Sequence, residues 1–248
     1  NTVDFKRFPG IGRKNVEIYY TKEGKGAGFA RNIGLEHAKG KYLIFSDADD
    51  YFYPELIYVC DKYLHSGADL IFLGVNSRNS DTLELSQDFR ASELEKFKLN
   101  AIERNNLELL RWNNKDVLNV PWGKMVKRSL VQENAICFDE VLAGNDAMFS
   151  LKSALKAETI LVDQTAVYCV TTRQGSLTQT VNKSIMKSRW GVACRINQEL
   201  YRQNLPELRY NLFIVQKRYF GSFMKEYFNA FKDIINVTPI RFVFADFC

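Results

Sequence analysis

A short apolar run that ends abruptly in carboxylates constrains the fold of this chain most. The run covers residues 42–45 (YLIF), and residues 46–50 (SDADD) follow it directly. A continuous, β-rich apolar run suits a strand that is covered on both faces. Helical patterns precede it over 28–38 and follow it from Pro54, and residues 69–75 have the pattern of the next strand. Strand, helix and strand in this order predict an α/β fold with a parallel sheet.

The composition describes a globular chain without strong bias. The 248 residues are 46% hydrophobic and 25% charged, with a formal net charge of +5, and such values are ordinary. So slight a positive excess does not indicate a nucleic-acid-binding protein, and we expect no nucleic-acid partner. No apolar run reaches the roughly 18 residues that a membrane-spanning helix requires. The five cysteines include no C-x-x-C pair, which favours free thiols in the reducing cytoplasm.

The D-x-D pair after the apolar run is the strongest candidate for chemistry. Side chains alternate between the two faces of an extended chain, so Asp47 and Asp49 point to one side. Two neighbouring carboxylates repel each other unless a cation neutralises them, and Mg²⁺ or Mn²⁺ favours oxygen ligands and bridges to phosphate oxygens. The carboxyl end of a strand in an open α/β sheet is also where ligands bind. By itself the pair is equally consistent with a solvated acidic loop.

The residues around this pair resemble the family 2 glycosyltransferases. Residues 26–50 follow that family's pattern, G-x-x-x-A-R-N-x-G, then A-x-G-x-Y and F-x-D-x-D-D, and a proline stands four residues further on. Residues 121–128 (PWGKMVKR) look like its P-W-x-K-L segment, and residues 136–140 (ICFDE) like its I-x-F-x-E step. Residues 144–149 resemble its E-D-x-x-F step, with Asn145 in place of the usual Glu.

The resemblance implies a GT-A fold, an α/β fold whose mixed, mostly parallel sheet is flanked by helices. We expect residues 1–180 to form the glycosyltransferase domain and residues 181–248 a C-terminal helical region, with helices over 184–203 and 208–232. The resemblance further implies an inverting, metal-dependent transfer of a sugar from a nucleotide-diphosphate donor, in the first place a UDP-sugar. The acceptor would be a saccharide or a lipid-linked molecule, in the synthesis of a bacterial cell-surface polysaccharide.

The resemblance also assigns roles to individual residues. Asp47 and Asp49 would hold Mn²⁺ or Mg²⁺ against the donor diphosphate. Residues 168–176 are similar to the family's Y-x-x-R-x-x-S loop, which folds over the donor. The donor-binding residues that the resemblance marks are Arg31, Asn32, Asp47, Asp49, Asp50, Arg173 and Ser176.

Asp146 is the candidate general base. A sugar hydroxyl needs a group that accepts its proton, and a carboxylate at the start of a helix suits this role. The competing interpretation is a helix N-cap, because Asp146 directly precedes the helical residues 147–149.

Two features of the chain leave alternatives open. The family opens with a strand and an acidic D-D-G-S turn that are not found here, so the chain looks like a member without its first strand. The alternative functions are a fragment that binds a nucleotide sugar without turning it over, and a D-x-D phosphatase, whose motif would need Thr at Tyr51. Residues 200–248 carry seven basic and four acidic residues and an aromatic stripe. This stripe either packs on the catalytic domain or makes the protein peripheral on the inner face of the membrane.

Overall fold

A five-stranded sheet forms the centre of the first part of the chain. The computed structural model describes residues 10–21, 25–112, 119–172, 182–220, 224–239 and 242. The strand order across the sheet is β1-β4-β3-β5-β2. The strands are β1 (Tyr42–Leu43), β2 (Tyr51–Phe52), β3 (Leu70–Asn79), β4 (Lys124–Lys127) and β5 (Ile160–Thr172).

The sheet is mixed, as the sequence predicts. β3 and β5 pair in parallel over nine residue pairs. The β1–β4, β3–β4 and β2–β5 pairings are antiparallel and contribute two, three and two pairs. The sheet is thus mostly parallel by length, although three of its four described pairings are antiparallel. The register of β3 and β5 shifts at Gly74, where an added Cβ would lie 2.3 Å from the carbonyl oxygen of Thr165. Only glycine allows this close approach.

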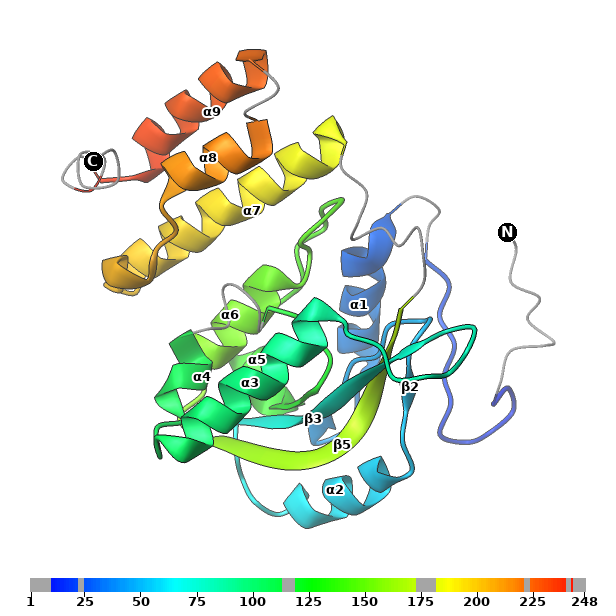
Figure 1. Cartoon of the computed structure of the whole chain (residues 1–248). Helices are drawn as coiled ribbons and strands as arrows, with labels where there is room; N and C mark the ends of the chain where they lie inside the picture. The colour runs from blue at the N-terminus through cyan, green and yellow to red at the C-terminus, as the bar shows by residue number, and fades with distance from the viewer. Residues whose placement is uncertain are drawn as a thin grey trace.

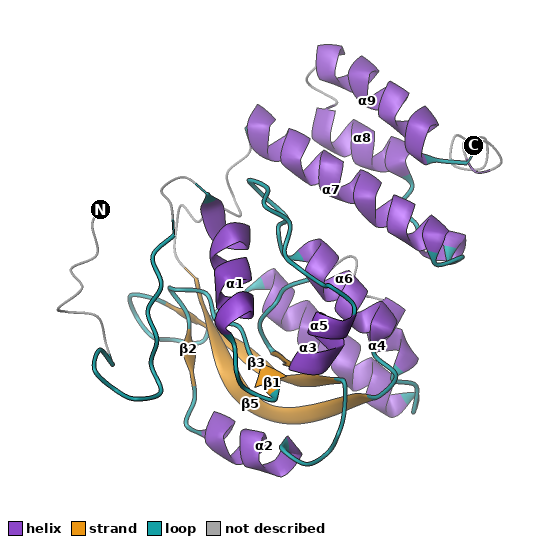
Figure 2. Ribbon diagram, turned by 180° about the vertical axis from the view of Figure 1, so that it is seen from behind, coloured by secondary structure: helices purple, strands orange, loops and turns teal. Residues whose placement is uncertain are grey.

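Six helices surround the sheet in the described part of the first 172 residues: α1 (Gly26–His37), α2 (Glu55–Tyr63), α3 (Phe89–Glu103), α4 (Glu108–Trp112), α5 (Arg128–Glu133) and α6 (Ala147–Lys156). α2 packs against β5 on one face, and α3 packs against β3 on the other (Figures 1 and 2). The apolar run 70–73 of β3 is at most 1% exposed because both of its faces are covered. This buried strand is the centre of the main hydrophobic core.

The last helices form a separate layer. They are α7 (Lys183–Arg202), the short 3₁₀ helix η4 (Pro206–Leu208), α8 (Leu212–Phe220) and α9 (Met224–Val237). Figure 1 shows α7, α8 and α9 stacked beyond α6, on the side of the molecule away from α2. α7 packs on α6 through an apolar cluster that includes Met148, Leu151 and Ile196. A second cluster, which includes Trp190, Leu212 and Ile234, joins α7 to α8 and α9.

Some sequence predictions are wrong in detail. Residues 16–20 have the composition of a strand, but they form none in the structure. Glu17 instead forms an ion pair with Lys39, just after α1, and no described strand pairs with the backbone of residues 16–20. The single helix expected over 208–232 is two helices, and the rings of Phe213 and Phe231 face each other between them at 6.0 Å. The division of the chain near residue 180 stays a prediction.

Two further findings concern the described residues alone. None of their helices combines the length and the hydropathy that a membrane span needs. The four described cysteines, Cys60, Cys137, Cys169 and Cys194, are free thiols.

Candidate active site

Arg31 links two segments of the chain. The first is the acidic turn after β1, which is residues 46–50 (SDADD), and the second is the segment that precedes α6. Its Nη2 donates to Oδ1 of Asp47 at 2.5 Å, and its Nη1 donates to Oδ1 of Asn145 at 2.6 Å. The guanidinium also lies 5.5 Å from the centre of the Phe138 ring. Only 16% of the Arg31 side chain is exposed. Two motifs more than 90 positions apart in the sequence therefore meet at one arginine.

Asn145 keeps this contact although the related pattern has Glu at its position. Its amide oxygen accepts the hydrogen bond from Arg31, as a carboxylate oxygen would. The exchange removes one negative charge from the site, and the Arg31 guanidinium forms an ion pair with Asp47.

The start of α1 is fixed by its packing on residues 136–140. An added Cβ on Gly28 would lie 2.1 Å from the carbonyl oxygen of Asp139, so glycine is required at this contact. Asn32 bonds both backbone polar groups of Phe138, donating to the oxygen at 3.0 Å and accepting from the nitrogen at 2.8 Å. Asn32 therefore helps to hold Arg31 in place, and its expected contact with a donor stays a prediction.

Hydrogen bonds from two residues of β5, Tyr168 and Thr171, hold the acidic turn in place. The carboxylate of Asp50 accepts from the Tyr168 hydroxyl at 2.6 Å and from the Thr171 amide at 2.8 Å. The same hydroxyl accepts from the amide of Asp47 at 3.0 Å, and Thr171 donates to the carbonyl oxygen of Asp49. Burial raises the pKa of Asp50, against the two hydrogen bonds that lower it. Asp50 thus orders the turn, while Asp49 lies at its exposed end.

The carboxylates of Asp47 and Asp49 are chemically suited to a shared cation. No group of three or more His, Cys, Asp or Glu side chains that could enclose a metal occurs among the described residues. Mg²⁺ is commonly held by one or two carboxylates together with the phosphate oxygens of a substrate. The pair fits a cation of this kind, which would be completed by a diphosphate.

Asp146 does not cap the helix that follows it. It stands at the N-cap position of α6, but its backbone is helical and its side chain makes no capping hydrogen bond. The N-cap interpretation is therefore wrong. Burial raises the pKa of Asp146, and the positive charges of Arg31 and Arg90 act in the opposite direction. The carboxyl group remains the candidate base in a site that contains two arginines.

A buried lysine lies near this carboxyl group. Lys124, at the start of β4, is 2% exposed, and its ammonium donates to the carbonyl oxygen of Val120 at 2.9 Å. Burial lowers the pKa of Lys124 to about 7, and the charge of Asp146 acts against this shift. The P-W-x-K segment of the sequence marks this lysine, but its burial could not be inferred from the motif.

Two aromatic rings and an arginine complete the site, and sequence reasoning assigned none of them a role. The rings of Trp122 and Tyr168 stack with their centres 5.6 Å apart. The Arg90 guanidinium, from the first turn of α3, lies 5.6 Å from the centre of the Trp122 ring. Trp122 and Tyr168 occur in the quoted motifs, whereas Arg90 has no motif around it. Arg173 and Ser176, expected to cover the donor, lie outside the described residues.

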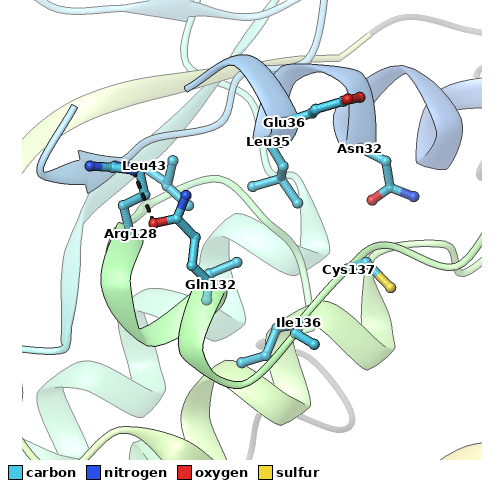
Figure 3. Close-up of a pocket in the computed structure, with 10 residues that line it drawn as sticks. Asn32, Leu35, Glu36, Leu43, Arg128, Gln132, Ile136 and Cys137 are labelled. Atoms are coloured by element: carbon cyan, nitrogen blue, oxygen red, sulfur yellow. Dashed lines mark hydrogen bonds between the residues drawn. The ribbon is translucent and has the colours of Figure 1, made fainter. Parts of the chain in front are cut away.

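A separate hollow lies at the edge of the sheet. Its volume is 320 Å³, and Figure 3 shows Leu35, Leu43 and Ile136 on its walls. Arg128 and Gln132 are joined across its rim by a hydrogen bond of 2.9 Å. None of the acidic residues of the candidate site lines this hollow.

The chain is similar to known glycosyltransferases in sequence. The model of the family described as glycosyl transferase family 2 matches residues 5–134. The putative glycosyltransferase EpsH of Bacillus subtilis is 23% identical over 201 residues, which are 77% of this chain and 52% of that protein. The poly(ribitol-phosphate) beta-N-acetylglucosaminyltransferase TarS of Staphylococcus aureus is 30% identical over 156 residues, 60% of this chain and 24% of TarS. The chain thus spans about half or less of these relatives.

Solved structures confirm the fold. The crystal structure of S. aureus TarS 1–349 in complex with UDP-GlcNAc matches with a TM-score of 0.58 and 21% identity, over 88% of this chain and 63% of that chain. The complex of the same TarS fragment with UDP matches with a TM-score of 0.54 and 20% identity, over 88% and 62%. The predicted GT-A fold is confirmed.

Proposed function

The chain belongs to glycosyltransferase family 2, and from this premise we propose that it transfers a sugar from a UDP-sugar to a saccharide or lipid-linked acceptor. The reaction would serve the synthesis of a cell-surface polysaccharide, and the similarity to TarS, a poly(ribitol-phosphate) beta-N-acetylglucosaminyltransferase, supports a role in building a polymer. The observation that carries the proposal is the meeting of Asp47, Arg31 and the segment of Asp146 at one place. This transfer requires ligands for a metal ion, a positively charged side chain that binds phosphate, and a base.

The donor diphosphate binds at the acidic turn. Asp47 and Asp49 would hold Mn²⁺ or Mg²⁺ there, and a cation bound in this way would offset the negative charge that builds on the leaving diphosphate. Arg31 adds a positive charge beside Asp47, and Asp50 keeps the turn in shape through Tyr168. The neighbouring structures that hold UDP-GlcNAc and UDP support a uridine nucleotide. We propose that Arg173 and Ser176, which follow β5 in the sequence, contact the donor.

Asp146 accepts the proton of the attacking hydroxyl. The hydroxyl oxygen forms a bond to the anomeric carbon, the bond from that carbon to the phosphate oxygen breaks, and UDP leaves with the bonding electron pair. A direct displacement of this kind inverts the anomeric carbon. General-base help is typically worth about 10²–10⁴-fold in rate. The raised pKa of Asp146 favours the role, because a stronger base is a better proton acceptor at neutral pH.

A transfer assay tests this function against its alternatives. The chain is incubated with a panel of UDP-sugars and saccharide acceptors, with Mn²⁺ or with EDTA, and mass spectrometry follows the products. We expect UDP release that requires both the acceptor and Mn²⁺. Binding of a UDP-sugar without any release of UDP would instead identify a nucleotide-sugar-binding fragment. Release of phosphate from p-nitrophenyl phosphate without a sugar would identify a phosphatase.

A membrane-facing role of the helical layer is a second proposal, and it rests on exposed apolar side chains. Ile214 on α8 and Phe228 and Ile235 on α9 are 66%, 63% and 54% exposed. Lys217 and Arg218 on α8 are exposed as well. Exposed apolar and basic groups together suit the surface of an anionic bilayer. We place the protein in the cytoplasm, at the inner face of the membrane, where lipid-linked acceptors would be met.

A further inference from the structure

Arg90 has more hydrogen-bond donors than partners. A guanidinium carries five N–H donors. Among the described residues its carboxylate neighbour is Asp88, and the 3.8 Å between Nε of Arg90 and Oδ1 of Asp88 exceeds a hydrogen-bond distance. The same oxygen of Asp88 already accepts from the amide of Ala91 at 3.0 Å, where it caps α3. One third of the Arg90 side chain is exposed, so a ligand could reach its unused donors.

Arg90 is nevertheless held in one place. Its guanidinium lies over the ring of Trp122, which is 1% exposed and stacks on Tyr168. The helix that carries it is tied to β3, because the amide of Asp88 donates to the Ser77 hydroxyl at 2.9 Å. An arginine that is stacked on a buried ring loses little freedom when it binds an anion.

Arg90 lies between the acidic turn and the candidate base. It is stacked on Trp122, which itself stacks on Tyr168, the residue that holds the acidic turn. Arg31 pairs with Asp47, whereas Arg90 projects from another helix, and the positive charges of Arg31 and Arg90 both lower the pKa of Asp146. The indole N–H of Trp122 beneath it is buried and has no hydrogen-bond acceptor among the described residues. Such an unpaired buried donor is costly unless a ligand or a water supplies the missing oxygen.

We propose that Arg90 binds an oxyanion of the acceptor, a phosphate or carboxylate group next to the hydroxyl that Asp146 deprotonates. This inference rests on the proposed function, and it names the class of acceptor as anionic. The planar fork of arginine matches both oxyanions with two parallel hydrogen bonds. Bound in this way, the oxyanion would hold the attacking hydroxyl near the base.

A nuclear magnetic resonance titration tests the inference, because Trp122 lies beside the binding group. The ¹⁵N-labelled chain is saturated with UDP and Mg²⁺, and the indole N–H signal of Trp122 is assigned with the Trp122→Phe variant. The probes are glycerol phosphate, glucuronate and neutral glycerol. We expect glycerol phosphate or glucuronate to shift the Trp122 signal saturably, and we expect no shift with glycerol. The arms of the titration tell a phosphate acceptor from a carboxylate acceptor.

Three variants make the result specific. Arg90→Gln should weaken the binding of the anionic probe at least tenfold, and Arg90→Lys should recover part of it because the charge returns without the fork. Arg104→Gln is the matched control, since this exposed arginine ends the same helix, and it should bind as the wild type does.

Several outcomes would overturn the inference. Unchanged binding in Arg90→Gln would remove the arginine from the acceptor site. Binding of the probe to the chain without UDP, but not to the UDP-saturated chain, would assign Arg90 to the donor diphosphate, and the proposed function would stand. A chain that does not bind UDP at all would contradict the proposed function itself, and the separate UDP titration shows which of the two has failed.

Discussion

The sheet half of the molecule, residues 10–172, and the helical layer of α7, α8 and α9 use polar groups in different ways. In the sheet half, carboxylates are built into the interior, as Asp50 is with Tyr168 and Asp163 with Lys62. The helical layer joins its helices through apolar side chains and through polar contacts between helices, such as the bond from Trp190 to Asp233 and the ion pair of the buried Glu226 of α9 with Lys183 of α7 at 2.6 Å.

Both regions expose large apolar side chains, such as Ile57 and Phe89 in the first and Ile214 and Phe228 in the second. The regions therefore differ in what their polar groups do: in the sheet half they order the acidic turn of the candidate site, and in the helical layer they join helices. We therefore propose the transfer chemistry for the sheet half.

The largest expected effect lies in the sheet half. Asp146→Asn keeps the shape of the side chain but cannot accept a proton, so kcat should fall by about 10²–10⁴-fold. UDP binding and Tm should barely change, because the carboxylate does not cap α6. The control is Asp139→Asn, a nearby carboxylate that pairs with Arg195 of α7 at 2.8 Å. Wild-type turnover in Asp146→Asn would move the base elsewhere, with Asp139 and Glu140 the next candidates.

The buried Lys124 should make the free energy of unfolding of the chain depend on pH. The pKa of Lys124 is about 7 in the folded chain and about 10.4 in an unfolded one. Between these values the unfolded state binds a proton that the folded state lacks, so the free energy of unfolding rises with pH. The limiting slope is about 1.4 kcal/mol per pH unit. Urea unfolding at pH 7 and pH 9.5 should show this rise in the wild type and lose it in Lys124→Met.

Lys96→Met is the control for this measurement. Lys96 is an exposed lysine on α3, and its removal should leave the pH dependence unchanged. If Lys124→Met retained the same rise with pH as the wild type, Lys124 would not be the group that titrates.

Membrane binding by the helical layer should depend on the basic residues at its surface. Each basic residue near an anionic bilayer contributes about 1 kcal/mol, and salt weakens the effect. The double variant Lys217→Gln and Arg218→Gln should therefore bind anionic vesicles up to about 30-fold more weakly at low salt, with kcat on a water-soluble acceptor unchanged. Lys96→Gln with Arg104→Gln removes two exposed charges from α3 and should have no effect. Absence of vesicle binding by the wild type would retire the membrane proposal.

The smallest expected effect is a loss of stability in the helical layer without a change in kcat. Trp190→Phe removes the indole N–H that donates to the exposed carboxylate of Asp233 at 2.8 Å. The loss should cost about 0.5–1.5 kcal/mol of stability and lower Tm by a few degrees, since 1 kcal/mol is about 2–4 °C in a chain of this size. We expect kcat to stay as it is. A large fall in kcat would mean that the helical layer takes part in the chemistry.

The sequence predicts the site where its residues are close together in a motif. Arg31, Asp47, Asp49 and Asp146 stand in short patterns with fixed spacing, and the structure brings the segments that carry them together. The role of Tyr168 depends instead on how β5 runs beneath the acidic turn, which no local pattern encodes.

The structural features that the sequence analysis did not predict have two causes: tertiary packing for Arg90 and residues 16–20, and an overlooked local signal for the last helices. Arg90 is in an ordinary polar helix, so only tertiary packing distinguishes it from other surface arginines. Residues 16–20 fail as a strand because strand propensity needs a pairing partner. For the helix expected over 208–232, Gly221 was an available signal, since it stands between the end of α8 and the start of α9.

The central claim is that the acidic turn binds a cation jointly with the donor diphosphate. Calorimetry of UDP binding, with Mn²⁺ and with EDTA, tests it directly in the wild type, in Asp49→Ala and in Asp61→Ala, an exposed aspartate of α2 that serves as control. We expect UDP to bind the wild type and Asp61→Ala only with Mn²⁺, and we expect Asp49→Ala to lose this binding while its Tm stays near that of the wild type. UDP binding that persists in EDTA, or that survives in Asp49→Ala, would contradict it.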